Sequence, residues 1–202
     1  MSSGSEPLVV IIQPMGMEVN VLEAPLHRYR PDIAVLITNM EGSVELAEAH
    51  LRNRWRNVTR HDVEVIKKII GEPWRADTIE EYMLAFNEAV EEISRRHQGR
   101  EIKWHVGTAG GTNLMSIASG MSAFTHRFPA YYSQPPQKHP ELAEEPAKLL
   151  VEIPLLMNTG PAHKCLQKKR SRQILEAILE YNSETGLGVQ QKELAYKLDS
   201  SA

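Results

Sequence analysis

The chain has 202 residues, of which 42% are hydrophobic and 24% are charged, a composition typical of a soluble globular protein. Its longest uninterrupted apolar runs, Leu8–Ile12 and Ile33–Ile37, are far shorter than the roughly 18 residues of a membrane-spanning helix, so we expect no such helix. The N-terminal sequence MSSGSEP has no basic start and no apolar core, which predicts no secretion. The single cysteine, Cys165, excludes an internal disulfide and a cysteine-based zinc site and fits a reducing cytoplasm.

The net charge of -3 is unevenly distributed along the chain. The acidic excess lies in residues 1–162, whereas His163–Arg172 contains five cations and no acid. We interpret this basic segment as a solvated connector, with a direct nucleic-acid contact as the alternative. It follows a turn-rich sequence, Asn158-Thr159-Gly160-Pro161, which predicts a boundary between a domain over residues 7–160 and a C-terminal segment over residues 161–202.

The first of these segments alternates between strand and helix patterns. Short apolar or alternating runs predict strands over Leu8–Ile12, Ile33–Ile37, Asp62–Ile70, Glu101–Val106, Phe128–Tyr132 and Leu149–Ile153. Apolar residues at helical spacing predict helices around Val19–Leu26, over Ser43–Arg54, from Thr78 to about His97, and over Asn113–Phe124. A short helix is the alternative for Asp62–Ile70, and Pro25 weakens the first helix prediction.

Two helix starts carry capping signals. Ser43 is a candidate N-cap for a helix that would bury Leu46, His50 and Leu51. The sequence Thr78-Ile-Glu-Glu81 has the form of a capping box, in which the side chains at both ends satisfy free backbone N–H groups. The apolar stripe behind this box makes its helix the safest local prediction.

Alternating strands and helices predict an α/β, Rossmann-like fold with a mostly parallel sheet and helices on both faces. In such sheets, ligands bind beyond the carboxyl ends of the strands. Three stretches follow predicted strands in this way: Gln13–Met17, Thr38–Gly42 and Gly107–Asn113.

The third stretch, GTAGGTN, carries the sharpest signal. Its glycines permit tight turns and close approach of a ligand, and free N–H groups at the start of the next helix suit a phosphate or another anion. It is not a Walker A loop, because Asn113 stands where that motif requires lysine, and it does not match G-x-G-x-x-G either. A tight turn that only seats a helix is the alternative interpretation.

The sequence GTAGGTNLMSIASGMSAF resembles the signature that follows the fourth strand of CARF domains, the CRISPR-associated Rossmann-fold ligand sensors. VVIIQPMGMEVN is similar to the first strand and turn of that family, and the resemblance covers roughly residues 7–155. It implies a homodimer that binds a cyclic oligoadenylate, often cyclic tetra-adenylate, across its two-fold axis, and it implies no cofactor.

By this resemblance, ligand contacts fall on all three stretches. The implied ligand-binding residues are Gln13, Pro14, Met15, Gly16, Met17, Thr38, Asn39, Met40, Glu41, Gly107, Thr108, Ala109, Gly110, Gly111, Thr112, Asn113, Met115 and Ser116. Because Pro14, Met15 and Met17 offer few polar groups, we expect backbone contacts to dominate in the first stretch.

The C-terminal sequence SRQILEAILEYNSETGLGVQQKELAYKLDSS resembles the opening of a winged helix-turn-helix. A CARF domain followed by this fold is the layout of archaeal CRISPR-linked transcription regulators, which implies DNA as a partner of a complete C-terminal domain. The sequence stops at Ala202, where the groove-reading helix should begin, so we expect no base readout by this chain. A helical hairpin used for dimerisation is the alternative.

The remaining reactive side chains are assigned structural roles. Eight histidines without an H-x-x-x-H pair predict no metal site, and no residue is assigned as catalytic. We expect His105 to be packed or hydrogen-bonded, and Met115 and Met121 to lie in the core, with Met115 bordering the ligand. Trp55, Trp74 and Trp104 are also expected to be packing residues.

Two functions remain open, a ligand-sensing transcriptional regulator and a ring nuclease. Some CARF domains cleave their cyclic ligand by attack of a ribose 2′-hydroxyl on the neighbouring phosphate. The three stretches contain no Lys or Arg to stabilise the developing charge, which favours the regulator.

Overall fold

The computed structural model describes residues 6–51, 62–75, 77–142 and 144–153, and these form a six-stranded sheet in the order β3-β2-β1-β4-β5-β6. Strands β1 to β5 are parallel to their neighbours, and β6 pairs antiparallel with β5. The strands are β1 (Leu8–Met15), β2 (Ile33–Thr38), β3 (Glu64–Ile69), β4 (Ile102–Gly107), β5 (Ala130–Ser133) and β6 (Leu150–Ile153). The mostly parallel, Rossmann-like fold predicted from the sequence is confirmed.

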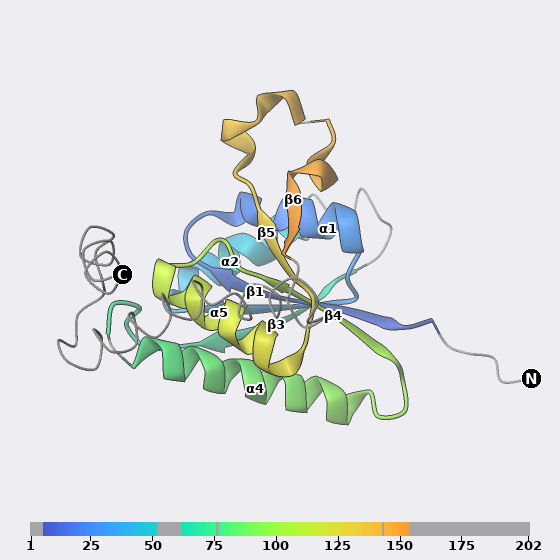
Figure 1. Cartoon of the computed structure of the whole chain (residues 1–202), viewed down its shortest axis with the longest axis vertical. Helices are drawn as coiled ribbons and strands as arrows, with labels where there is room; N and C mark the ends of the chain where they lie inside the picture. Colours follow the sequence, from blue (N-terminus) through green and yellow to red (C-terminus); the bar gives the residue numbers. More distant parts are fainter. Residues whose placement is uncertain (1–5, 52–61, 76, 143, 154–202) are drawn as a thin grey trace, which may run out of the picture. The chain divides into compact units, whose positions relative to one another are not determined.

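Helices cover both faces of this sheet, with α4 and α5 on one side and α1 and α2 on the other (Figure 1). The α-helices are α1 (Glu23–Tyr29), α2 (Glu41–His50), α4 (Thr78–Arg96) and α5 (Asn113–His126). Short 3₁₀ helices are η1 (Val19–Leu22), η3 (Pro136–Lys138), η4 (Pro140–Leu142) and η5 (Pro146–Leu149). Within the described ranges, no helix is long and apolar enough to cross a membrane.

The core consists of two apolar layers separated by the sheet. Alternate residues of β1 point to opposite faces, so Val10 and Ile12 pack with α4 and α5, whereas Ile11 packs with α1 and α2. Because β1 and β2 are covered on both faces, both strands need the continuous apolar runs that the sequence contains.

The central strand β1 is longer than predicted and includes Gln13, Pro14 and Met15, which we expected in a loop. A polar residue followed by proline usually marks the end of a strand, because proline cannot donate to the ladder. Here β1 continues to pair with β2 as far as Met15 and Thr38, although its pairing with β4 stops at Ile12 and Val106.

The predicted start of α2 is wrong, and its predicted buried face is right only in part. The helix begins at Glu41 after an extended N-cap residue, Met40, so Ser43 is not the cap. Leu51 is buried as predicted and His50 is partly buried, but Leu46 faces solvent, and Val44 and Ala47 are buried instead. The sheet decides which face of this short helix is covered, and the sequence pattern alone did not.

The predicted capping box of α4 does not form either, although α4 itself has the predicted extent. The Thr78 hydroxyl donates to the carbonyl of Glu72 at 3.0 Å, and the Glu81 carboxylate accepts the N–H of Gly71 at 2.8 Å. Both side chains therefore fasten the connection from β3 to α4 rather than capping each other.

The structure separates the predicted core residues into two groups. Met115 is fully buried, and Trp104 stacks on Phe128 with ring centroids 5.0 Å apart, as predicted for packing residues. Met121 and Trp74 are exposed, Trp74 at 79%, so their assignment to the core is wrong. The predicted domain boundary, the C-terminal helices, Cys165 and Trp55 lie outside the described residues.

His105 of β4 is packed, as predicted, and stacks on Tyr29 of α1 with ring centroids 3.8 Å apart. Desolvation by burial lowers the pKa of His105; the charge of Glu152 opposes this shift, and that of Lys103 adds to it.

We predict that this histidine makes the fold acid-sensitive. Below about pH 6.5 the unfolded histidine binds a proton that the folded ring resists, so the free energy of unfolding falls as pH falls. His105→Phe keeps a ring on Tyr29 but removes the titration. Urea unfolding at about pH 7.5 and 5.5 will show a smaller loss for this variant than for the parent. Equal losses in both proteins would contradict the prediction.

Candidate functional site

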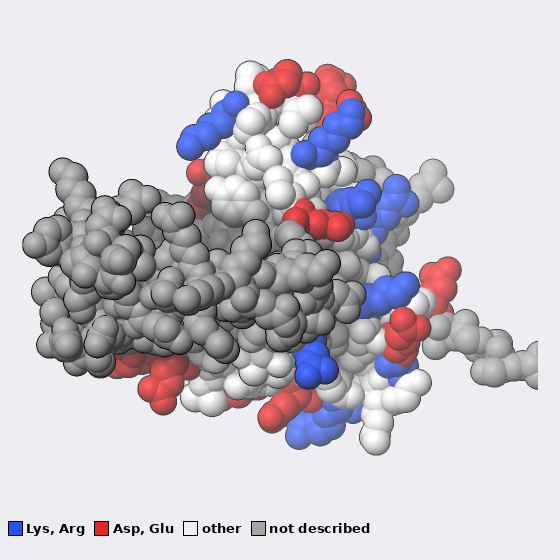
Figure 2. All heavy atoms as spheres, in the orientation of Figure 1, with Lys and Arg blue, Asp and Glu red and all other residues white. Residues whose placement is uncertain are grey.

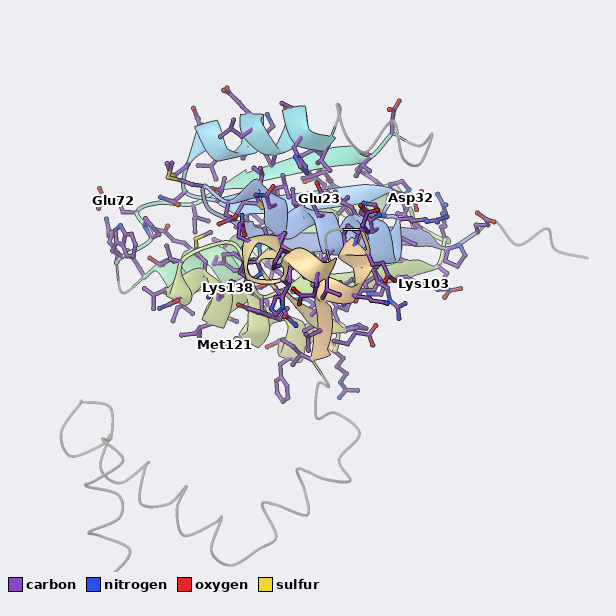
Figure 3. All side chains as sticks on the ribbon, turned by 90° about the horizontal axis from the view of Figure 1, so that it is seen from above. Glu23, Asp32, Glu72, Lys103, Met121 and Lys138 are labelled. Atoms are coloured by element: carbon purple, nitrogen blue, oxygen red, sulfur yellow. The ribbon has the colours of Figure 1, made fainter. Side chains whose placement is uncertain are left out.

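The three predicted stretches follow neighbouring strands and lie side by side at the carboxyl edge of the sheet. β1 lies between β2 and β4. Successive strands are added on one side of β1 as far as β3 and on its other side from β4 onward, so the strand order reverses at β1. Crevices at such reversal points are the usual ligand sites of open α/β sheets. In Figure 3, Glu72 marks this carboxyl edge, and Asp32 and Lys103 mark the opposite edge. The prediction that Gly107–Asn113 lies at the carboxyl edge is confirmed.

Three carbonyl groups of the connection between β4 and α5 accept hydrogen bonds from within the protein. The carbonyl of Gly107 accepts a hydrogen bond from the Ser119 hydroxyl at 2.7 Å. The carbonyl of Ala109 accepts one from the Gln13 side-chain amide, and that of Gly110 accepts the N–H of Gly16 at 2.5 Å. The first and third stretches are therefore fastened to each other.

Strand β5 holds the start of the same loop. Both the N–H and the hydroxyl of Thr108 donate to the carbonyl of Tyr131, at 2.9 and 3.0 Å. The Tyr131 hydroxyl in turn donates to Oε1 of Gln13 at 2.8 Å. Burial raises the pKa of Tyr131 well above its usual range, so this hydroxyl stays a donor at physiological pH.

Most N–H groups of the loop, unlike these carbonyl groups, lack hydrogen-bond partners among the described residues. Among the described residues, none accepts the N–H groups of residues 109–114, whereas the N–H of Met115 donates to the Thr112 hydroxyl at 3.4 Å. Thr112 is the N-cap of α5, so these free donors coincide with the positive end of the helix dipole. Inward carbonyls and free amides at a helix start create a local preference for an anion.

Glycine is required at Gly107 and Gly110 for packing within the protein. A Cβ at Gly107 would overlap the carboxamide of Gln13. Gly110 has φ +106°, and a Cβ there would lie 2.7 Å from Val21 and 2.8 Å from the carbonyl oxygen of Pro14. At Gly111 the added atom would lie 3.1 Å from the Met115 side chain. At all three positions the atoms that a Cβ would approach belong to the protein itself. The glycines are therefore needed for the packing of the loop and do not simply clear space for a ligand.

The predicted ligand-binding residues differ in their accessibility. The partly or fully exposed ones are Gly16, Met17, Asn39, Met40, Glu41, Thr108, Gly110, Gly111, Thr112, Asn113 and Ser116. The buried ones are Gln13, Pro14, Met15, Thr38, Gly107, Ala109 and Met115. A ligand at the loop surface cannot reach the side chains of the buried group without rearrangement, so direct contacts through them stay predictions.

Two residues that shape the site were not predicted from the sequence. Tyr131 lies on β5 and Ser119 on the buried face of α5. The small residues of α5 indicated that this helix approaches the sheet closely, which was a usable signal for Ser119. No local pattern connects Tyr131 to Gln13, because 118 positions separate them along the chain.

The surroundings of the loop contain few cations. Exposed carboxylates Glu18, Glu41 and Glu72 lie after β1, β2 and β3, and the three stretches contain no Lys or Arg. Figure 2 shows acidic and basic side chains mixed among the coloured residues of one face. In the part of the chain that the structure describes, no group of three or more His, Cys, Asp or Glu side chains could hold a metal ion. An anion at this site would thus depend on backbone amides and hydroxyls.

No protein-family model and no curated protein matches the sequence, but solved structures do. Enterococcus italicus Csm6 bound to cyclic hexa-2′-fluoro-hexa-dAMP shares 14% identity, with a TM-score of 0.57 over 88% of this chain and 47% of the Csm6 chain. Can2 from Sulfobacillus thermosulfidooxidans in complex with cyclic tetra-adenylate shares 13% identity, with a TM-score of 0.48 over 62% of this chain and 32% of that chain.

A type III CRISPR defence DNA nuclease activated by cyclic oligoadenylate shares 21% identity, with a TM-score of 0.49 over 65% of this chain and 19% of that chain. The present chain spans about half the length of the Csm6 chain that it matches. At 14% identity the likeness to Csm6 is one of fold, and it agrees with the predicted Rossmann-like class.

We predict that Gly110→Ala destabilises the protein by about 1–3 kcal/mol, because alanine is strained at this positive φ and its Cβ would collide with Val21. Gly120 of α5 is the matched control, since a Cβ there meets nothing within 4 Å. Gly120→Ala is expected to stabilise the helix by about 0.5–1 kcal/mol. Thermal melts of both variants test this, and an unchanged melting temperature for Gly110→Ala would contradict the described loop conformation.

Proposed function

We propose that this chain is a CARF-type sensor that binds a cyclic oligoadenylate, with cyclic tetra-adenylate as the first candidate, at the loop between β4 and α5. The observation that carries the proposal is the polarity of this loop. The carbonyls of Gly107, Ala109 and Gly110 accept hydrogen bonds from within the protein, and the amide groups from Ala109 to Leu114 have no acceptor among the described residues. Free amides in this arrangement suit the phosphates of an oligonucleotide.

The choice of a cyclic oligoadenylate over other phosphate ligands has two further supports. The sequence GTAGGTNLMSIASGMSAF, which resembles the CARF signature, covers the loop and most of α5. The fold is also similar to that of a Csm6 whose structure contains a cyclic hexanucleotide analogue. Hydroxyl and amide side chains of Thr112, Asn113 and Ser116 are at least partly accessible for contacts with ribose or base.

We assign binding rather than cleavage to this site. Stabilising the charge of a phosphoryl-transfer transition state usually requires a cation, and the three stretches contain neither Lys nor Arg. A ring nuclease is the alternative, and linear products after incubation with labelled cyclic tetra-adenylate would establish it.

The proposed role of the ligand-bound protein is to regulate transcription by binding DNA. Its support comes from the sequence alone, since the helical pattern of Ile174, Ala177, Ile178 and Tyr181 lies outside the described residues. In this proposal, DNA is bound through the C-terminal sequence that resembles the opening of a winged helix-turn-helix.

The proposed sensor acts as a C2 homodimer, because a symmetric ligand is best matched by two copies of one loop. An apolar stripe on α5 supports this arrangement: Ile117, Met121 and Phe124 follow helical spacing and are each 47–56% exposed. Leu84 of the adjoining α4 is also exposed and lines an open hollow of about 520 Å³. Because α5 begins at the ligand loop, pairing along this stripe would bring two loops toward a common axis.

We predict that Asn113→Asp weakens binding of cyclic tetra-adenylate at least tenfold without destabilising the fold. A carboxylate in the first turn of α5 repels phosphate, whereas it interacts favourably with the helix dipole by about 0.3–1 kcal/mol. Gln98→Glu adds the same charge in an exposed turn at the opposite edge of the sheet and should leave affinity unchanged. Calorimetric titration and thermal melts measure the two effects separately.

The same titration tests the character of the site. Since the loops lack cations, affinity should change less than about threefold between 50 and 200 mM salt, in contrast to sites built on several Lys or Arg. Failure of the parent protein to bind any cyclic oligoadenylate would refute the proposed function. Equal affinity in Asn113→Asp and the parent would place the ligand elsewhere.

We predict that Met121→Glu converts a dimeric parent into a monomer, because a charge in the middle of the α5 stripe cannot be buried without a partner. Leu46→Glu is the matched control, since Leu46 is similarly exposed on α2, on the opposite face of the sheet. Light scattering at micromolar concentration distinguishes the variants. A monomeric parent, or a dimer in which Met121→Glu has no effect, would count against pairing through α5.

A further inference from the structure

Gln13 is a polar side chain at the centre of the sheet, fully buried among apolar strands. Buried amides are costly unless their donors and acceptors are satisfied. The groups that satisfy Gln13 belong to three parts of the chain: Ala109 in the loop after β4, Tyr131 on β5, and Pro14 on β1. Its sequence neighbourhood implied a ligand contact, but the structure turns its side chain inward.

We propose that Gln13 is a positioning residue for the ligand loop: its carboxamide, oriented by Tyr131, holds the Ala109 carbonyl inward and thereby leaves the following amides free for an anion. The inference rests on the proposed function for the ligand, but the positioning itself is a property of the free protein.

The orientation of the carboxamide follows from the two ends of the network. Two carbonyl oxygens, those of Ala109 and Pro14, face one end of the amide, the latter at 3.4 Å, and because a carbonyl can only accept, this end must be Nε2. The other end is then Oε1, which accepts from the Tyr131 hydroxyl at 2.8 Å. Only a group that accepts at one end and donates at the other fits between a hydroxyl and two carbonyls.

The space for the carboxamide is provided by Gly107, where any Cβ would overlap it. Gly107 and Gln13 are thus complementary, and the loop cannot begin as it does without both. Because Thr108 is bound to the Tyr131 carbonyl, the same tyrosine fixes the loop backbone and the orientation of Gln13.

The test replaces Gln13 with residues of similar size. Gln13→Met keeps the volume and removes all three hydrogen bonds of the side chain. Gln13→Glu keeps the acceptor for Tyr131 but, when ionised, opposes the carbonyls of Ala109 and Pro14. When protonated, its O–H can donate to Ala109 while its other oxygen accepts from Tyr131, which restores the network.

Protonation therefore provides a rescue that a merely structural role would not show. Burial raises the pKa of such a carboxyl, which brings its titration toward neutrality. The titratable groups around this position are Tyr131 of β5, Tyr29 of α1, Tyr82 of α4 and His105 of β4. Burial raises the pKa of the three tyrosines and lowers that of the histidine, so none of the four changes charge between about pH 7 and 9.

Two readouts are measured on the full chain, each compared with the parent at the same pH: amide chemical shifts of residues 108–114 without ligand, and affinity for cyclic tetra-adenylate by calorimetry. For Gln13→Met we expect altered shifts and at least tenfold weaker binding. For Gln13→Glu we expect the same defects at pH 9 and recovery of both readouts toward pH 7. Tyr131→Phe should give an intermediate loss.

Ile93→Ala is the control for stability, since Ile93 is fully buried near the end of α4, where the chain leads to the start of β4 rather than to the loop after it. It should lower the melting temperature but leave the loop shifts and affinity unchanged. Unaltered loop shifts in Gln13→Met, or no pH-dependent recovery in Gln13→Glu, would overturn the positioning role. If the parent does not bind the probe, the proposed function fails, and the ligand-free shifts still decide whether Gln13 positions the loop.

Discussion

The carboxyl edge of the sheet depends on one buried amide, that of Gln13. Its hydrogen bonds connect β1 to the loop after β4 and to Tyr131 of β5, so the strand at the reversal point is fixed to the two strands on one side of it. A buried polar network of this kind is favourable only when every member is satisfied. Gly107, Gly110 and the conformation of the loop follow from that requirement, since each accommodates a neighbour inside the protein.

This arrangement explains how a loop without Lys or Arg can favour an anion. The carbonyls of Gly107, Ala109 and Gly110 accept hydrogen bonds from Ser119, Gln13 and Gly16. The N–H groups at the start of α5 have no such partners among the described residues, so their dipoles point toward a ligand uncompensated. Nearby carboxylates of Glu18 and Glu41 oppose a phosphate, so binding would come from short-range directional contacts rather than long-range attraction. Such contacts suit recognition of a defined ligand better than stabilisation of a developing charge.

The apolar stripe on α5 lies on the same helix as the proposed ligand site and is the surface through which we propose that two copies of the chain pair. Ile117, Met121 and Phe124 do not enter the core, although their spacing is that of a buried helix face. The opposite face of α5 carries the small and buried residues, such as Ala118 and Ser119, that let the helix approach the sheet. One helix thus presents its N-terminus to the proposed ligand, Ser119 to the loop carbonyl, and a half-exposed apolar stripe on its other face.

The sequence by itself determined the alternation of strands and helices, the Rossmann-like class and the location of the GTAGGTN loop, because continuous apolar runs, helical periodicity and glycine clusters are local signals. It also predicted the buried Met115 and the packed His105. It could not predict that β1 continues through Pro14, that Met121 and Trp74 are exposed, or that Gln13 points inward. Those outcomes depend on which face of each element the sheet covers and on partners such as Tyr131, 118 positions away, and only the tertiary structure brings such residues within hydrogen-bond distance.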